Sequence, residues 1–225
     1  MLIAVPCGKP LGAVEMTRLE KATAALIVVV ALGIGWMIEK AINRDGLDES
    51  SELLEAGVIV LPQGRPMPRL DMADQNGHSV AMDSLTGTWS VLFFGYTFCP
   101  DICPTTLAQL RELKRKLPPA SAQRLQVYFV SVDPNRDTPA QMKDYLSYFD
   151  KSFKGLTASE AVLTQFSTAT GIPYLPPDTT KPNYTVQHSG NLAVIGPDGR
   201  LRGFIRAPFD TALLVKRLPQ LLESD

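Results

Sequence analysis

The chain has 225 residues, of which 45% are hydrophobic and 20% charged, and this composition excludes wholesale disorder. Its 22 basic and 23 acidic residues give a formal net charge of −1, so we expect no nucleic-acid partner. Three cysteines are too few for a disulfide-rich scaffold, and two histidines leave little choice of imidazole for a metal site.

A candidate membrane anchor lies near the N-terminus. The 17 residues of Ala22–Ile38 carry no charge, and as a helix they would be about 25 Å long, against roughly 30 Å for a bilayer core. Ala41 and Ile42 extend the apolar stretch, and Trp36 would lie at an interface. We therefore predict an uncleaved transmembrane anchor over residues 22–42. The alternatives are a buried core helix and a cleaved signal peptide, although the residues after the apolar run form a poor cleavage site.

The basic residues around this segment indicate its orientation. Three precede it and two follow it closely, which favours a cytoplasmic or matrix-side location for residues 1–21 and export of the remainder. Met16 is an alternative start of the chain, and starting there would remove Cys7.

The next segment leads into a folded domain. Residues 43–63 are predicted to be an extended tether, because they are polar or mixed in character and end in a proline-rich stretch. The domain is predicted to cover residues 64–225. It begins with a β-hairpin over Leu70–Met82, whose turn is Asp74–His78. His78 is thus predicted to lie on the surface.

The rest of the domain alternates strands and helices. Ser90–Tyr96 and Leu125–Val132 are short apolar runs of the kind that form buried strands. Prolines and Gly171 mark the ends of segments with helical spacing. This order predicts one α/β domain with a mixed sheet. The predicted helices cover Thr105–Leu117, residues 139–149, residues 160–170 and Asp210–Leu222, and a late hairpin joins Asn191–Ile195 to Leu201–Ile205.

A pair of cysteines, Cys99 and Cys103, lies where a strand gives way to a helix, which is where open α/β sheets place their ligand sites. Pro104 suits the first helical position, so we expect Cys103 at the N-cap, where free amides stabilise a thiolate. Three residues separate the cysteines, whereas a thioredoxin-type redox motif has two. The longer spacing permits a disulfide and leaves room for a metal. The alternative is a structural disulfide or two inert buried thiols.

His188 is predicted to lie in a loop or at a strand edge, just before a strand. By itself it would be an ordinary surface or hydrogen-bonded histidine. Together with two thiolates it completes a donor set soft enough for Cu(I), and a trigonal set of two sulfurs and one imidazole also accommodates Cu(II). Zinc normally takes a fourth ligand.

Three stretches in this order resemble the Sco/SenC family of copper-assembly proteins. They are Gly-Tyr-Thr-Phe-Cys-Pro-Asp-Ile-Cys-Pro at residues 95–104, Ser-Val-Asp-Pro-Asn-Arg-Asp-Thr-Pro at residues 131–139, and His188-Ser189 before a strand and a Pro-Asp-Gly turn. The resemblance covers about residues 61–211. It implies a thioredoxin-like fold anchored in the inner membrane by a single span, with the domain in the periplasm or the mitochondrial intermembrane space.

The resemblance also implies a function. Members of this family assist metallation of the binuclear copper centre in subunit II of cytochrome c oxidase, as copper donor, as reductant of that subunit's cysteines, or both. The implied partners are therefore that subunit and, in addition, other copper chaperones or thiol reductants. The implied cofactor is a copper ion, as Cu(I) or Cu(II).

By position, Cys99, Cys103 and His188 match the family's three copper ligands. Asp133 and Asp137 match its acidic segment, which we interpret as facing a partner or supporting the ligands from behind. Asp137 could instead be a helix cap. The chain departs from many relatives in a proline-rich insert before the histidine, Ile172–Asn183, which bears on loop geometry and partner fit.

Two functions stay open on the sequence. The first is the copper chaperone. The second is a membrane-tethered thiol–disulfide oxidoreductase in which Cys99 attacks a partner's disulfide and Cys103 resolves the mixed disulfide, leaving His188 dispensable. A thiol peroxidase is a weaker third reading, because no basic residue flanks Cys99.

Overall fold

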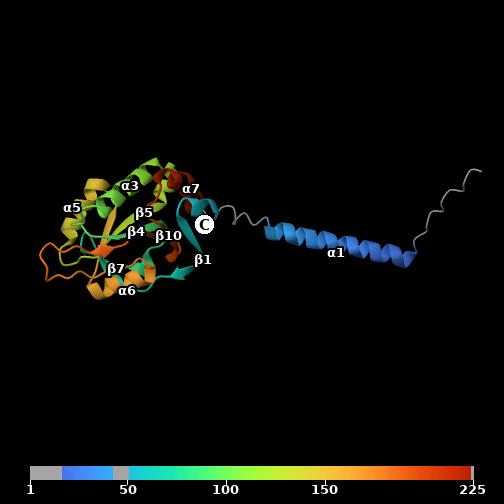
Figure 1. Cartoon of the computed structure of the whole chain (residues 1–225), viewed down its shortest axis with the longest axis horizontal. Coiled ribbons are helices and arrows are strands. Elements are labelled where there is room, and N and C mark those ends of the chain that lie inside the picture. Colours follow the sequence, from blue (N-terminus) through green and yellow to red (C-terminus); the bar gives the residue numbers. More distant parts are fainter. Residues whose placement is uncertain (1–16, 43–50, 224–225) are drawn as a thin grey trace, which may run out of the picture. The chain divides into compact units, whose positions relative to one another are not determined.

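The computed structural model describes residues 17–42 and 51–223 (Figure 1). The chain divides into two units, Met1–Gly46 and Leu47–Asp225, and each is described by itself. Cys7 lies outside the described residues.

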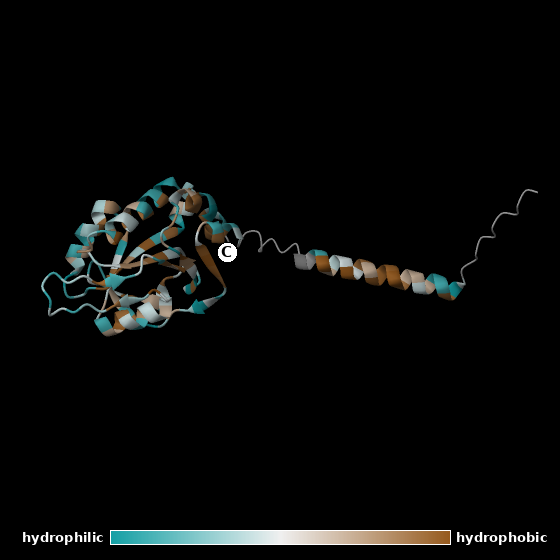
Figure 2. Cartoon of the chain, viewed as in Figure 1, coloured by the Kyte–Doolittle hydropathy of each residue, from teal (hydrophilic) through white to brown (hydrophobic). Residues whose placement is uncertain are grey.

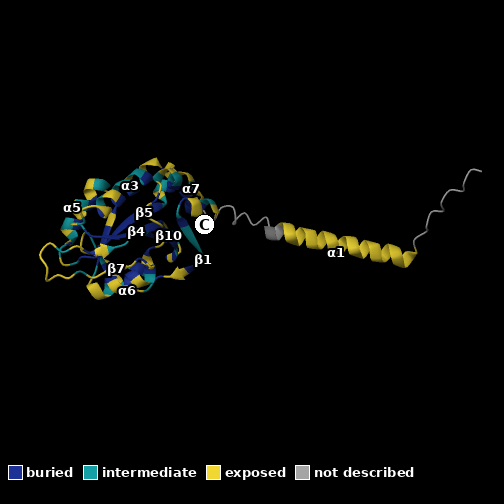
Figure 3. Cartoon of the chain, in the orientation of Figure 1, coloured by how far each residue is buried: buried dark blue, intermediate teal, exposed yellow. Residues whose placement is uncertain are grey.

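Where the structure describes the first unit, it is a helix, α1 (Arg18–Ile42). Its portion Arg18–Glu39 is long and apolar enough to cross a membrane, and none of it is buried within the protein (Figures 2 and 3). The predicted helix over residues 22–42 is confirmed, and the alternative of a buried core helix is wrong. A signal sequence would have the same length and composition, so an uncleaved anchor stays a prediction.

The second unit is built on an eight-stranded sheet with the order β1-β10-β9-β4-β5-β6-β2-β3. Strands β4, β5 and β6 are parallel to one another, whereas β9, β10, β1, β2 and β3 pair with their neighbours in antiparallel fashion. The predicted mixed sheet is confirmed. The strands are β1 (Val58–Pro66), β2 (Asp71–Asp74), β3 (Ser79–Ala81), β4 (Trp89–Gly95), β5 (Leu125–Ser131), β6 (Lys154–Thr157), β9 (Leu192–Ile195) and β10 (Arg200–Ile205).

Helices cover both faces of this sheet. The helices are α3 (Ile102–Lys116), α4 (Pro119–Gln123), α5 (Pro139–Phe149), α6 (Glu160–Thr170) and α7 (Thr211–Glu223), with a short 3₁₀ turn, η1 (Met82–Ser84). Because side chains alternate along a strand, β4 sends Val91 and Phe93 toward α3, α5 and α7, and Leu92 and Phe94 toward α6. All four are fully buried, which explains the continuous apolar run in the sequence.

The structure differs from the predicted tether over residues 43–63. Residues 51–55 are helical, and β1 pairs with β10 at the edge of the sheet. The prolines at positions 62 and 66 indicated an extended chain, which is correct, but that chain is paired in the sheet. An edge strand tolerates prolines, and the register shifts between Val60 and Arg65. The folded unit therefore begins before residue 64.

Two helix starts also differ from expectation. Helix α3 begins at Ile102 with Asp101 at its N-cap, so Cys103 lies within the first turn rather than at the cap. Helix α5 is capped by Thr138, whose hydroxyl accepts a hydrogen bond from the Gln141 amide, and not by Asp137. Each helix begins or is capped within two residues of the predicted position, but the difference changes the surroundings of Cys103 and Asp137.

Candidate metal centre

The two cysteines lie at the carboxyl end of β4, on the loop into α3 and in its first turn. Cys99 is half-buried and Cys103 fully buried, and neither is in a disulfide. The sulfur of Cys103 packs directly over Gly95, where a Cβ atom would come within 2.6 Å of it. A glycine at the end of β4 therefore makes room for the sulfur.

His188 reaches the cysteines from a separate two-stranded sheet. It lies in β8 (Gln187–His188), which pairs with β7 (Tyr174–Leu175). Its Nδ1 atom lies 3.0 Å from the Val186 carbonyl oxygen. Because that oxygen can only accept, Nδ1 carries the proton in the neutral ring, and the Nε2 lone pair faces Cys103. The predicted position of His188 at a strand edge is confirmed, and β7 lies within the proline-rich insert.

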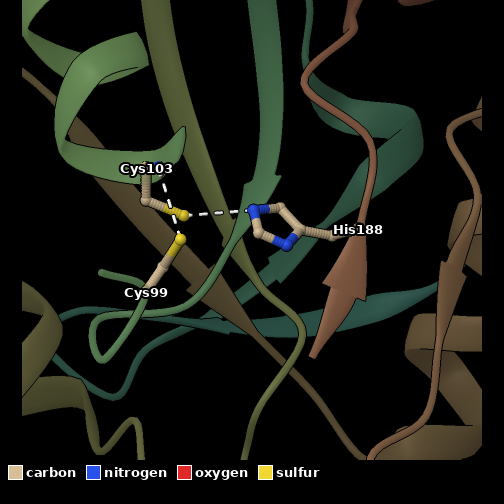
Figure 4. Close-up of side chains that lie close together, drawn as sticks. All are labelled: Cys99, Cys103 and His188. Carbon is tan, nitrogen blue, oxygen red and sulfur yellow. Dashed lines mark hydrogen bonds between the residues drawn. The ribbon is translucent and has the colours of Figure 1, made fainter. Parts of the chain in front are cut away.

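The three side chains converge on one point (Figure 4). The Cys103 Sγ and His188 Nε2 atoms are 3.3 Å apart, and the ligand atoms of Cys99, Cys103 and His188 all lie within 4.8 Å of one another. Donor atoms that each lie about 2.0–2.3 Å from one ion are at most about 4.6 Å apart, so the cluster fits a single metal after small adjustments. Within the described residues, it is the one such group close enough to hold a metal ion.

The thiols differ in acidity. A hydrogen bond from the Cys103 thiol, together with backbone amides and His188, lowers the pKa of Cys99 to about 5 against the opposing effect of burial. The hydrogen bond to Cys99, burial and the neighbouring thiolate charge all raise the pKa of Cys103. The Cys103 amide donates to the Cys99 sulfur at 3.4 Å. The expectation that the helix start stabilises a Cys103 thiolate is wrong, because the stabilised sulfur is that of Cys99.

Asp137 is buried beneath the loop that carries Cys99. Its carboxylate accepts hydrogen bonds from the Thr97 amide at 3.0 Å, the Thr97 hydroxyl at 2.6 Å and the Ser131 hydroxyl at 2.6 Å. Burial raises the pKa of Asp137, and these hydrogen bonds oppose that shift. Asp137 does not cap α5, because Thr138 does. It is also 1% exposed, so a partner could not touch it. It ties the loop to the end of β5.

Asp133 is also fully buried, so it too cannot meet a partner directly. Its carboxylate accepts a hydrogen bond from the Tyr184 hydroxyl at 2.8 Å and forms an ion pair with Arg136. Tyr184 lies four residues before His188. Asp133 therefore contacts the segment that carries the imidazole.

Several side chains around the centre were not singled out from the sequence. The ring of Tyr96 packs edge-on against the His188 ring, with centroids 5.5 Å apart, and its hydroxyl hydrogen-bonds to the Val186 backbone. Gly95 and Arg136 also lie beside the centre. Nothing in a single sequence marks either residue by itself as part of the site. His78 is exposed in the β2–β3 turn beside Asp74, as predicted.

Comparison with known proteins places this geometry in a family. The SCO1/SenC family model matches residues 63–223. A protein from Stutzerimonas stutzeri that is named for copper binding is 46% identical over 179 residues, covering 80% of this chain and 88% of that protein. Copper-bound ScoI from Bradyrhizobium japonicum is 34% identical, with a TM-score of 0.58 over 69% of this chain and 98% of that one. Copper-bound yeast Sco1 is 28% identical, with a TM-score of 0.66 over 72% and 90% of the two chains. The thioredoxin-like fold is thus confirmed, and this chain belongs to the SCO1/SenC family.

Proposed function

We propose that this protein is a membrane-anchored copper chaperone that binds one copper ion through Cys99, Cys103 and His188. It delivers the ion during assembly of the binuclear copper centre of cytochrome c oxidase subunit II. The observation that carries the proposal is the convergence of two sulfurs and one imidazole nitrogen within 4.8 Å. The copper in the solved structures of its relatives supports the choice of metal.

The donor set favours copper over zinc. Two thiolates and one imidazole suit Cu(I), and in a trigonal arrangement they also suit Cu(II). A structural zinc site takes four protein ligands, and within the described residues no fourth cysteine, histidine or carboxylate joins the cluster.

Loading and release follow from the two thiols. With its pKa of about 5, Cys99 is a thiolate at neutral pH, so copper binding displaces one proton, from Cys103. Release would proceed by ligand exchange, in which an incoming thiolate replaces one sulfur at a time. A Cys99–Cys103 disulfide offers no thiolate, so the redox state of the pair gates loading.

The surface beside the centre suits contact with another protein. Phe98 and Ile102, on either side of Cys99 in the chain, are 53% and 43% exposed, and Leu175, which pairs with Gln187 next to His188, is 60% exposed. Exposed apolar side chains that gather beside a site are typical of a surface that binds another molecule, and we propose that this molecule is a protein. The partner that we propose is the oxidase subunit, while other copper chaperones supply the metal and thiol reductants keep the pair reduced.

The location that we propose is the inner membrane, with α1 as a single uncleaved span. The folded unit then lies in the periplasm or the mitochondrial intermembrane space. An anchored domain is confined to the same membrane as the proposed partner, which is itself a membrane protein.

A second candidate is a thiol–disulfide oxidoreductase. It is favoured by the asymmetry of the pair, in which Cys99 is accessible with a pKa of about 5 and Cys103 is buried with a raised pKa. That is the pattern of an attacking and a resolving thiol. In this function Cys99 attacks a partner's disulfide, Cys103 then displaces the partner's thiolate, and the pair ends as a disulfide.

One experiment separates the two. The reduced full-length protein in detergent is titrated with Cu(I) against a chromophoric competitor, as wild type, as His188→Ala and as His78→Ala, the matched control on the surface. We expect one copper per chain and a sharp loss of affinity in His188→Ala only. Equal affinity in all three proteins, with unchanged disulfide reduction, would favour the oxidoreductase.

A further inference from the structure

The segment that brings His188 to the cysteines has little structure of its own. We call residues 174–188 the His188 hairpin. Its strands β7 and β8 are two residues long, and both belong to a sheet separate from the eight-stranded one. So short a hairpin is unstable by itself in water. Residues 178–183 at its tip are exposed, so its position depends on contacts made by the residues on either side of the tip.

Tyr174 and Val186 are buried in the core, and Tyr184 adds polar contacts beside them. Its hydroxyl donates to the Asp133 carboxylate at 2.8 Å, and the Arg136 guanidinium lies over its ring, 3.7 Å from the centroid. Asn183, with a φ of 55°, occupies the left-handed region that asparagine tolerates, and it turns the chain immediately before Tyr184.

The acceptor of this contact is rigid. Asp133 follows the end of β5 and is fully buried, with its amide donating to the Ser131 hydroxyl. Its carboxylate also pairs with Arg136, so one buried anion holds both the hydroxyl and the guanidinium that pack on each other. A hydrogen bond to a buried charge is stronger than one between neutral groups.

Arg136 extends the connection to the loop that carries Cys99. Its guanidinium lies 5.1 Å from the centroid of the Phe98 ring and 5.5 Å from that of Tyr96. Tyr96 in turn packs against the His188 ring. Arg136 therefore contacts Phe98 before Cys99, Tyr96 beside the His188 ring and Tyr184 in the His188 hairpin.

We propose that Tyr184, Asp133 and Arg136 form a latch that holds the His188 hairpin closed over the two cysteines. All three are positioning residues, because they act on the metal through His188. With the latch closed, the site offers three ligands. With the latch open, the imidazole leaves and two thiols remain, which is the state from which an acceptor takes the ion. This inference rests on the proposed copper-binding function and adds the device that sets its affinity.

The test uses Tyr184→Phe, which removes one hydroxyl and keeps the ring beneath Arg136. We expect the reduced full-length protein in detergent to bind Cu(I) roughly ten- to a hundredfold more weakly, since one hydrogen bond to a charged group is removed from the closed state. Tyr128→Phe, at a buried tyrosine of β5 whose ring lies beneath the Lys154 ammonium, serves as the matched control and should bind like wild type. Arg136→Lys keeps a charge near Asp133 but lacks the planar group that stacks, and should weaken binding in the same direction.

A double-mutant cycle shows whether the effect passes through the imidazole. In a His188→Ala background, Tyr184→Phe should cause no further change in copper affinity, because there is no ligand left to position. A Tyr184→Phe protein that binds copper like wild type, or one that weakens binding equally with and without His188, would overturn the latch. If His188→Ala itself binds like wild type, it is the copper site that fails. Denaturant unfolding of each variant checks that the folded state persists.

Discussion

The Sγ atom of Cys103 and the Nε2 atom of His188 lie 3.3 Å apart although 85 residues separate them in the chain. The contact joins the first turn of α3 to a hairpin outside the main sheet. Substitutions that displace the Cys103 sulfur or the His188 ring should therefore weaken metal binding.

Gly95→Ala should disturb the site from below. The added methyl group would lie 2.6 Å from the Cys103 sulfur and 2.9 Å from the Phe129 ring, and both distances are too short, so both neighbours or the backbone must move. Overpacking of this kind destabilises a core by about 1–3 kcal/mol. We expect a fall of this size in the free energy of unfolding, measured in denaturant, together with weaker copper binding. Gly155→Ala, whose nearest contact would be a flexible Leu146 methyl at 3.1 Å, should leave copper affinity unchanged. A Gly95→Ala protein that binds copper normally would contradict this packing argument.

Asp137→Ala should loosen the loop that carries Cys99. The substitution leaves two donors of Thr97 and one of Ser131 without their acceptor, and a buried unsatisfied donor costs about 1–3 kcal/mol. We expect lower stability and lower copper affinity, measured by chemical denaturation and competition titration. Asp144→Ala, on the exposed face of α5, is the control and should change stability by no more than about 0.5 kcal/mol. Equal stability of the two variants would show that Asp137 does not support the loop.

Cys99 should react as a thiolate far below the pH at which ordinary thiols do. Its pKa is about 5, and only the thiolate is nucleophilic, so labelling by iodoacetamide should fall as the pH falls through about 5. Mass spectrometry of the reduced protein measures the labelled fraction at each pH. Cys103→Ala removes the hydrogen bond that contributes most to the low pKa and should move the midpoint to higher pH. A wild-type midpoint near 8 or 9 would contradict the description of the pair.

The N-terminal helix should keep the protein in the membrane. We expect the full chain to remain in the membrane fraction after alkaline carbonate washing, because Arg18–Glu39 can span the bilayer. A chain that starts at Leu47 should be soluble and should bind copper like the full-length protein. N-terminal sequencing of the mature protein decides between anchor and signal, and a mature chain that begins after residue 42 would show that the anchor is cleaved.

Much of this fold could be predicted because its signals are local. The buried run at β4 and β5, the turn at Asp74–His78 and the glycine that ends α6 each lie within a few residues of the feature they mark. Strand β6 was missed, since its four residues include an exposed Lys154 and a glycine and show no clear alternation. Strand β1 was missed because its prolines are permitted only by its place at the edge, which a single sequence does not show.

The candidate site, too, was predictable from the sequence only where its signals are local. The residue types and spacing of Cys99 and Cys103 were sufficient to single out the pair, the chemistry of the donor set pointed to His188, and the resemblance matched all three to copper ligands. Which sulfur is the stabilised one depends mainly on the hydrogen bond between the two thiols, which a sequence does not show, and α3 also begins two residues earlier than predicted. The contacts of Asp133 with Tyr184, and of Gly95 with Cys103, join distant parts of the chain and have no local signal.

The most direct test of the central claim is X-ray absorption spectroscopy of the reduced, copper-loaded protein. The account predicts two sulfur neighbours and one imidazole nitrogen around each copper ion, with the imidazole scattering absent in His188→Ala and retained in His78→Ala. A copper environment of sulfur alone in the wild-type protein, or one that His188→Ala leaves unchanged, would contradict it.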